Sequence, residues 1–302
     1  LLDSLTSGGH FREICDTDTT GIIPGDNLTV TVTVSYDGPG GTALPASAAK
    51  TTNSLFAGRS GNAVTVAFAR HLQNLEPTVS GVSTVASAVQ TTPIDWGGTY
   101  AVDFIPISNS ELTDYNGNGL AVANITAGPN GDCSGLFGSF AGGTLSGISL
   151  TDAVIYGGVC SGGLAGRCDG ATEILGCRLY VTDLANVSQY IISGTHSIGG
   201  LVGRCDGALT ISDSFAAPAR VYGGSASIYI GGLVGYCGTD SALSRCYADT
   251  DVHGDASPDL GGLIGHCGAG GAVTDCYALG NLSSVGSLYF GGLAGGSSTT
   301  TY

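Results

Sequence analysis

Apolar and polar positions alternate in short runs through the second half of the chain, and turns rich in glycine separate these runs. In the segment 261–290, an apolar run from Gly261 leads to a turn at 268–271, and residues 273–277 then alternate. A second turn follows at Gly280, before an apolar run that ends at Phe290. Alternation with a period of two predicts β-strands, and runs this short leave no room for a helix. We therefore predict three short strands in this segment.

The beginning of this segment recurs six times as a phrase of the type Gly-Gly-Leu-apolar-Gly. The phrases occupy residues 134–138, 162–166, 199–203, 231–235, 261–265 and 291–295. Their leucines lie 28, 37, 32, 30 and 30 residues apart, a period typical of solenoids, propellers and arrays. A propeller blade needs four strands in about 40–50 residues, so the spacing favours the solenoid. We predict an all-β fold, a parallel β-solenoid of about six coils with an N-terminal strand-plus-helix cap.

The first 60 residues contain one clear strand pattern, in which apolar side chains occupy every second position. These residues are Leu28, Val30, Val32, Val34 and Tyr36. Such alternation predicts a half-buried strand, which must pair with the region of Leu55, with the solenoid edge or with another chain. We therefore assign residues 1–60 to an N-terminal β segment and regard this strand as a candidate assembly strand.

The following residues carry the helical pattern. Residues 63–75 have an apolar stripe with helical spacing, and Pro77 ends it; a second, weaker helix pattern covers 79–89. A solenoid needs a cap that shields its terminal coil from strand pairing. We predict a helical cap at 61–91 and the solenoid at 92–302, with no comparable capping element after Gly295.

Cysteines keep the register of the repeat. Cys168, Cys205, Cys237 and Cys267 each follow a repeat leucine by four residues, and nine residues later come Cys177, Ser214, Cys246 and Cys276. Two cysteines that flank a turn can reach the separation that a disulfide needs, which predicts bridges 168–177, 237–246 and 267–276. Cys133 and Cys160 precede successive phrases and can bridge neighbouring coils, whereas Cys15 and Cys205 remain without an assigned partner. The alternative is a buried ladder of thiols.

These phrases and their following strands resemble the GLUG-motif repeats of bacterial cell-surface proteins and some secreted peptidases. The second half of the family pattern, an apolar strand ending near a tyrosine, matches 212–215, 244–247 and 274–277. The segments 70–75, 93–96, 104–107 and 115–119 resemble the lead-in that precedes such repeats, so the resemblance covers residues 62–296. The cysteines and the spacing of 37 residues depart from the family pattern. The resemblance implies an extracellular β-solenoid and implies no chemical reaction.

Composition narrows the classes of partner. The net charge is −15 and Lys50 is the single lysine, which argues against binding to nucleic acid, whose phosphates need Lys and Arg. No apolar run reaches the length of about 18 residues that spans a membrane. Ten cysteines in a chain with few charges indicate an oxidising, extracellular environment. The absence of methionine, even at position 1, leads us to expect a processed form or a fragment.

Candidate chemistry is sparse. The chain has no zinc-protease, phosphate-loop, nucleophile-elbow or dinucleotide motif, so we expect no catalytic or cofactor site. Arg167, Asp169, Arg204 and Asp206 occupy equivalent turns of successive coils, where they form surface ion pairs or contact a sugar or a partner's carboxylate. The acidic segment with Asp249, Asp251, His253, Asp255 and Asp259 is either a solvated loop or a weak Ca²⁺ site.

These observations predict a non-catalytic, extracellular protein with a structural or adhesive role at the cell surface. Its expected partners are further copies of itself, stacked head to tail into a fibre, or other surface proteins and glycans. The alternatives are a polysaccharide-degrading β-helix, which needs converging carboxylates, and a carbohydrate-binding protein. The carbohydrate-binding alternative requires exposed aromatic side chains, for which the candidates are Tyr222, Tyr229, Tyr236 and Tyr289.

Overall fold

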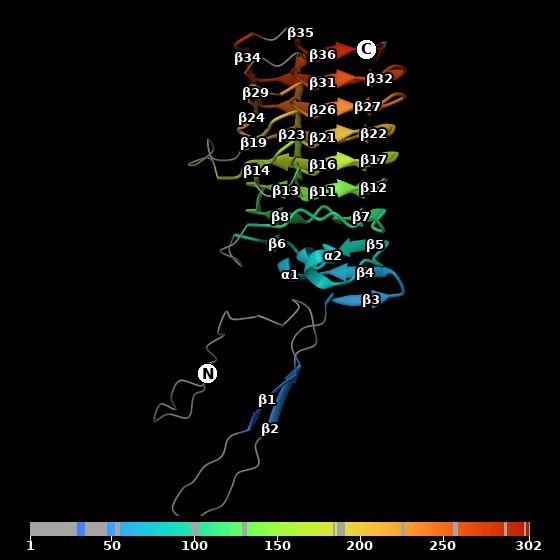
Figure 1. Cartoon of the computed structure of the whole chain (residues 1–302), viewed down its shortest axis with the longest axis vertical. Coiled ribbons are helices and arrows are strands. Elements are labelled where there is room, and N and C mark those ends of the chain that lie inside the picture. Colours follow the sequence, from blue (N-terminus) through green and yellow to red (C-terminus); the bar gives the residue numbers. More distant parts are fainter. Residues whose placement is uncertain are drawn as a thin grey trace, which may run out of the picture.

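Short strands separated by glycine-rich turns wind into stacked coils in the computed structural model of the chain (Figure 1). Successive coils pair in parallel, which confirms the predicted all-β parallel β-solenoid of about six coils. The structure describes residues 29–33, 47–51, 55–97, 103–128, 132–183, 185, 191–224, 227–255, 259–286, 289–298 and 300–301. No helix in these segments is long and apolar enough to cross a membrane.

Each repeat contains five strands where the sequence predicted three. The segment 261–290 contributes β31, β32, β33, β34 and the start of β35, and each belongs to a different sheet. Single glycines make the additional breaks, which an alternation pattern does not reveal. Gly280, between β33 and β34, has a φ of 95°, a backbone conformation that favours glycine.

Sheets 1 and 2 flank the Gly-Gly-Leu phrase and contain six strands each. Sheet 1 contains β10 (Cys133–Ser134), β15 (Cys160–Gly162), β20 (Ser197–Gly199), β25 (Tyr229–Gly231), β30 (Asp259–Gly261) and β35 (Tyr289–Gly291). Sheet 2 contains β11 (Phe137–Phe140), β16 (Ala165–Cys168), β21 (Val202–Cys205), β26 (Val234–Cys237), β31 (Ile264–Cys267) and β36 (Ala294–Ser297). Equivalent residues of the repeat are register partners, so each side chain lies above its own counterpart.

Sheets 3, 4 and 5 complete each coil. Sheet 3 contains β3 (Gly58–Ser60), β4 (Ala63–Val66), β5 (Ser87–Gln90), β7 (Asp114–Asn116), β12 (Gly143–Ser146), β17 (Thr172–Leu175), β22 (Leu209–Ser212), β27 (Ala242–Ser244), β32 (Gly271–Thr274) and β37 (Thr300–Thr301). Sheet 4 contains β6 (Ile94–Asp95), β8 (Ala121–Ala123), β13 (Ser149–Thr151), β18 (Arg178–Tyr180), β23 (Phe215–Ala217), β28 (Tyr247–Asp249) and β33 (Tyr277–Leu279). Sheet 5 contains β9 (Thr126–Ala127), β14 (Val154–Tyr156), β19 (Ile191–Gly194), β24 (Arg220–Gly223), β29 (Asp251–Gly254) and β34 (Leu282–Ser284).

The core is a column of apolar side chains along the solenoid axis. The repeat leucines are fully buried in five successive coils, at Leu136, Leu164, Leu201, Leu233 and Leu263. The glycines beside them allow neighbouring coils to approach through their backbones, because a Cβ there meets the carbonyl oxygen of the next coil. The repeated phrase therefore encodes both the buried column and the close stacking around it.

Two short helices lie at the N-terminal end of the solenoid, between β4 and β5 (Figure 1). They are α1 (Ala69–Gln73) and α2 (Pro77–Ser80), much shorter than the helices predicted at 63–75 and 79–89. Residues 63–66 form β4 instead, because their alternating side chains pair in parallel with β5. The parallel ladder of sheet 3 thus starts within the segment predicted as a helical cap.

The predicted N-terminal strand has a partner within the chain. β1 (Thr29–Thr33) pairs antiparallel with β2 (Ser47–Thr51), which differs from the three partners that the sequence suggested. This pairing includes Val30 and Val32 of the candidate assembly strand. Leu28, Val34 and Tyr36 lie outside the described residues.

Candidate functional site

Five polar or aromatic residues form one outward-facing column along sheet 2. Ser139, Arg167, Arg204, Tyr236 and His266 are register partners in five successive coils. We call this column, with its contacts Asp169, Asp206, Tyr229 and Asp259, the arginine–tyrosine strip. The strip contains all four residues that the sequence predicted as ligand contacts.

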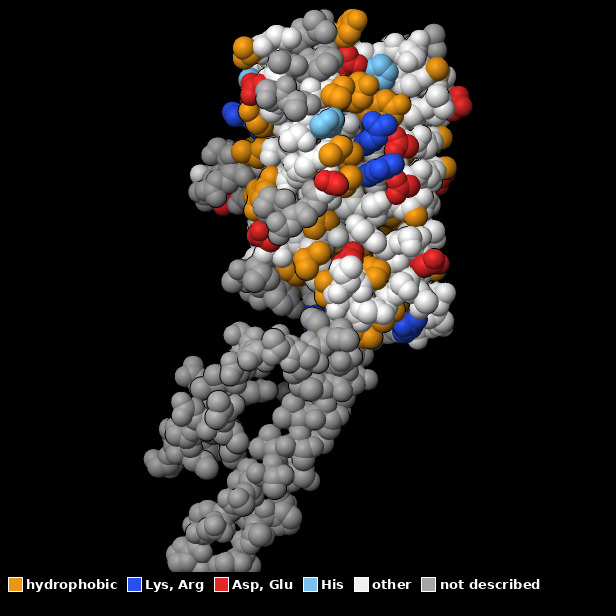
Figure 2. Space-filling view, viewed as in Figure 1, with side chains coloured by type: hydrophobic (Ala, Val, Ile, Leu, Met, Phe, Trp, Pro, Cys, Tyr) orange, Lys and Arg blue, Asp and Glu red, His pale blue; other side chains and the backbone are white. Residues whose placement is uncertain are grey.

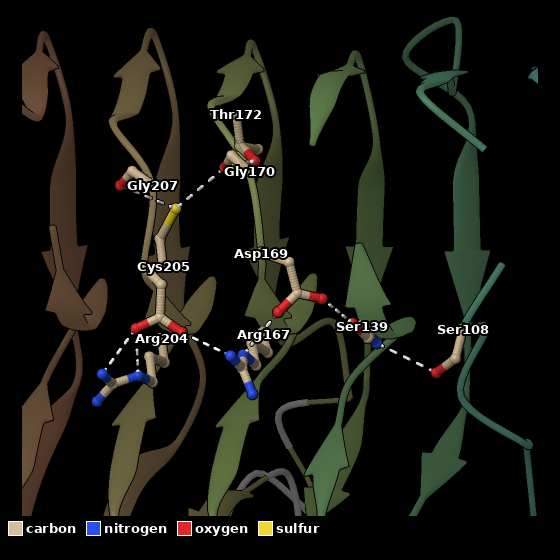
Figure 3. A network of polar contacts seen from close by, with 10 residues as sticks. Ser108, Ser139, Arg167, Asp169, Gly170, Thr172, Arg204, Cys205 and Gly207 are labelled. Atoms are coloured by element: carbon tan, nitrogen blue, oxygen red, sulfur yellow. Dashed lines mark hydrogen bonds and ion pairs between the residues drawn. The ribbon is translucent and has the colours of Figure 1, made fainter. Parts of the chain in front are cut away.

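Ion pairs fix the basic half of the strip (Figure 3). Arg167 Nε lies 2.7 Å from Asp169 Oδ1, and Arg167 Nη2 lies 2.8 Å from Asp206 Oδ2 in the next coil. Arg204 Nη2 lies 2.6 Å from Asp206 Oδ1. Each carboxylate is also a hydrogen-bond acceptor, and the Ser139 hydroxyl donates to Asp169 over 2.6 Å. The predicted surface pairs therefore form a network that joins three coils.

Aromatic rings continue the strip beyond the arginines. The Arg204 guanidinium carbon lies 4.4 Å from the centre of the Tyr236 ring, a cation–π geometry. Tyr236 stacks on His266 at 5.8 Å, and Tyr229 from sheet 1 tilts against both rings at 5.2 Å. Nδ1 of His266 donates to Asp259 over 2.6 Å, because a carboxylate can only accept.

The strip is accessible to a ligand and keeps its charges. The Arg167 and Arg204 side chains are 45% and 33% exposed. Partial burial acts to lower the pKa of Arg204, but the Asp206 carboxylate outweighs this effect and raises the pKa. On the face seen in Figure 2, basic and acidic side chains gather beside hydrophobic and histidine side chains in the upper half of the solenoid. Fixed donors, fixed acceptors and apolar ring surfaces thus lie together on one face.

The sequence predicted only part of this site. Tyr229 and Tyr236 were candidates as isolated exposed aromatics, whereas Tyr222 lies on sheet 5 and Tyr289 in the last described coil. Ser139 and His266 were not predicted as site residues. Their signal was their position, since each occupies the same place after the repeat leucine as Arg167 and Arg204.

The cysteines stack between coils, which corrects the predicted bridges within a coil. Cys168, Cys205, Cys237 and Cys267 are register partners along sheet 2, and the sulfurs of Cys237 and Cys267 lie 3.1 Å apart. Cys246 and Cys276 likewise contact each other from successive coils. All nine cysteines in the described residues are free thiols, so the pairs 168–177, 237–246 and 267–276 are not bonded. Cys15 lies outside the described residues.

Two thiol pairs differ in environment from the buried column. Cys133 and Cys160 are register partners, so the bridge predicted between them stays a prediction. Cys246 donates to Cys276 and lowers the pKa of the Cys276 thiol to about 7. Because the thiolate is the nucleophile, Cys276 is the more reactive thiol of its pair.

No metal site is evident in the described part of the chain. No group of three or more His, Cys, Asp or Glu side chains there is arranged to hold an ion. The acidic segment around Asp251 and Asp255 forms β29 and the residue that follows it, rather than a loop. Alternation along this strand turns its side chains to opposite faces, so the carboxylates do not converge.

The comparisons with known proteins identify the fold. No protein-family model and no curated protein matches the chain. A solved structure that matches is the crystal structure of a putative immunoglobulin A1 protease from Bacteroides ovatus, with a TM-score of 0.52 and 15% identity. The match covers 82% of this chain and 87% of the other. Identity this low supports the β-solenoid fold alone, and the GLUG-repeat resemblance stays a prediction.

The same comparison corrects one expectation. The sequence led us to expect a protein that is not an enzyme, yet a chain with this fold is named for a protease. The β-solenoid therefore gives no ground for excluding catalysis, and the absence of local motifs was too weak a reason for that expectation.

Proposed function

We propose that this protein is an extracellular surface protein that binds glycans through the arginine–tyrosine strip. The observation that carries this proposal is the column itself, in which ion-paired arginines and tyrosine rings follow one another in register. Sugars present hydroxyl groups at their edges and apolar C–H surfaces on their faces. The strip offers a match to both.

The charge of the strip favours a neutral or weakly charged glycan. Asp169 and Asp206 balance Arg167 and Arg204, so the arginines offer directed N–H groups without a net positive charge. The net charge of −15 also disfavours polyanions. The low content of charged residues and the solved neighbour's name, which refers to immunoglobulin A1, support a location outside the cell.

Replacing Arg204 with alanine is expected to weaken glycan binding about tenfold, because Arg204 contacts both the acidic network and the Tyr236 ring. A glycan array of neutral and acidic oligosaccharides identifies the strongest ligand, and isothermal titration calorimetry then measures its affinity. Arg245→Ala is the matched control, since Arg245 forms a 2.6 Å ion pair with Asp213 away from the strip. Equal binding by the two variants, or no binding by the wild type, contradicts the proposal.

A second candidate function is self-association through the last described coil. Large apolar side chains are exposed there, including Val285 at 76% and Phe290 at 53%. The helices α1 and α2 occupy the opposite end. Two copies can therefore meet with their last coils facing each other, as in an isologous dimer, more readily than head to tail.

Sedimentation velocity over a wide range of concentrations tests this second candidate. Val285→Asp is expected to abolish a dimer that the wild type forms, because a carboxylate cannot be buried there without a partner. Phe68, which is 57% exposed at the N-terminal end, supplies the control. A monomeric wild type, or loss of association in Phe68→Asp alone, contradicts the contact between last coils.

A further inference from the structure

A shallow hollow of about 300 Å³ lies on the outer face of sheet 5. It is lined by side chains from three successive coils: Arg220 and Tyr222 of β24, Asp251 and His253 of β29, and Asn281 and Ser283 beside and within β34. Tyr222 is the register partner of His253, and His253 is the register partner of Ser283. The fold thus brings a tyrosine, a histidine and a serine into one column.

His253 connects a carboxylate to a hydroxyl. Its Nε2 lies 2.9 Å from Asp255 Oδ1, and its Nδ1 lies 2.7 Å from the Ser283 hydroxyl oxygen. A carboxylate can only accept, so Nε2 carries the proton of the neutral ring and Nδ1 accepts from Ser283. This is the relation of carboxylate, imidazole and hydroxyl that activates a serine nucleophile, which is recognised by geometry rather than by order in the sequence.

Tyr222 holds the other two groups in place. Its hydroxyl donates to Asp255 Oδ2 over 2.7 Å, and its ring stacks on the His253 ring at 5.4 Å with a 4° angle between the planes. The bonds from Tyr222 and then from His253 lower the pKa of Asp255, so this carboxylate stays ionised. The imidazole is therefore fixed through a ring nitrogen and through its face.

We propose that Ser283, His253 and Asp255 form a hydrolytic centre for short acyl esters, a function independent of the glycan-binding strip. Ser283 Oγ attacks the ester carbonyl carbon while His253 Nδ1 takes the hydroxyl proton. The bond from that carbon to the alcohol oxygen then breaks, and His253 returns the proton to the leaving alcohol. Water, deprotonated by His253, attacks the acyl-serine and releases the carboxylic acid and Ser283.

The remaining walls of the hollow fit the charge that this reaction develops. Asn281 lies next to β34 and carries a side-chain amide, which donates to Asp251 Oδ1 over 3.0 Å. Arg220 forms no ion pair with any described residue, so its N–H groups are available to an oxygen in the hollow. Donors placed this way stabilise a carbonyl oxygen that becomes negative. The small volume favours a short acyl group over a long chain.

A fluorophosphonate probe tests the centre on the intact chain. We expect phosphonylation of Ser283, located by peptide mass spectrometry, and loss of labelling in His253→Gln. Hydrolysis of p-nitrophenyl acetate is expected to fall at least about 100-fold in Ser283→Ala. Asp255→Asn is expected to lower kcat with little change in KM, because Asp255 is a positioning residue that acts through His253.

The matched control is Ser193→Ala, which removes a serine from the same column of sheet 5, where the register partner is Tyr222 rather than a histidine. This variant is expected to keep the wild-type rate and labelling. Labelling of the wild type does not depend on whether a variant folds. A wild-type chain that is not labelled at Ser283, or that hydrolyses the ester no faster than Ser283→Ala, overturns the proposal.

Discussion

Replacing Gly232 with alanine is expected to lower the free energy of unfolding by about 3 kcal/mol, the upper range for overpacking a tight interior. A Cβ at Gly232 would lie 2.2 Å from the backbone oxygen of Gly262 and 2.8 Å from the Cβ of Ala248. The Gly262 oxygen belongs to a backbone whose amide is bonded to Gly291 over 3.2 Å, so it cannot move without separating two coils. Denaturation in guanidinium chloride measures the loss as a lower midpoint.

Gly292→Ala is the matched control for this prediction. Gly292 occupies the same place in the phrase of the last described coil, and a Cβ there meets no atom within 4 Å. Its substitution is expected to change the free energy of unfolding by less than about 0.5 kcal/mol. Equal losses in both variants would mean that the phrase needs glycine for its backbone conformation rather than for the close approach of the next coil.

The same pair explains why the fold was predictable. A glycine that admits the next coil and a leucine that fills the axis must recur once per coil, so the period is written directly in the sequence. The number of strands per coil is not written there, because single residues such as Gly280 make a break without a polar run. Short alternation patterns therefore gave the strands but merged their boundaries.

The cysteines show the limit of local spacing. Cys237 and Cys246 are nine residues apart and were predicted to meet across a turn, yet Cys237 contacts Cys267 of the next coil. In a parallel stack the equivalent residue of the next coil lies only about 4.8 Å away, closer than most residues of the same coil. Register, rather than distance along the chain, decides the neighbours.

The two surface sites follow the same rule with different visibility. Arg167 and Arg204 were predicted because an Arg-x-Asp pattern repeats after the leucine in successive coils. Tyr222, His253 and Ser283 were not predicted as a group because three different residue types occupy one column. Alignment of the coils by their leucines would have placed them together, whereas a search for local motifs could not.

Replacing Glu76 with alanine is expected to lower the free energy of unfolding by about 2–3 kcal/mol, the cost of losing hydrogen bonds to a charged group. Glu76 is 4% exposed and caps α2, since its Oε1 accepts from the Thr78 amide over 3.1 Å. Its Oε2 accepts from the Ser108 amide over 2.6 Å. One carboxylate thus fastens the helical end to the coil beside it, and thermal or guanidinium denaturation measures its contribution.

Two further substitutions separate the parts of this contribution. Glu76→Gln keeps one acceptor oxygen but places an amide NH₂ against one of the two donors, so about half of the loss is expected. Glu111→Ala, at an exposed glutamate in the same region, is expected to have no measurable effect. Ser108 also accepts from the Ser139 amide through its hydroxyl over 3.2 Å, which links the capped end to the arginine–tyrosine strip (Figure 3). If Glu76→Ala unfolds at the wild-type midpoint, the helices only cover the solenoid and do not stabilise it; if the midpoint falls, the helical end stabilises the coils below it.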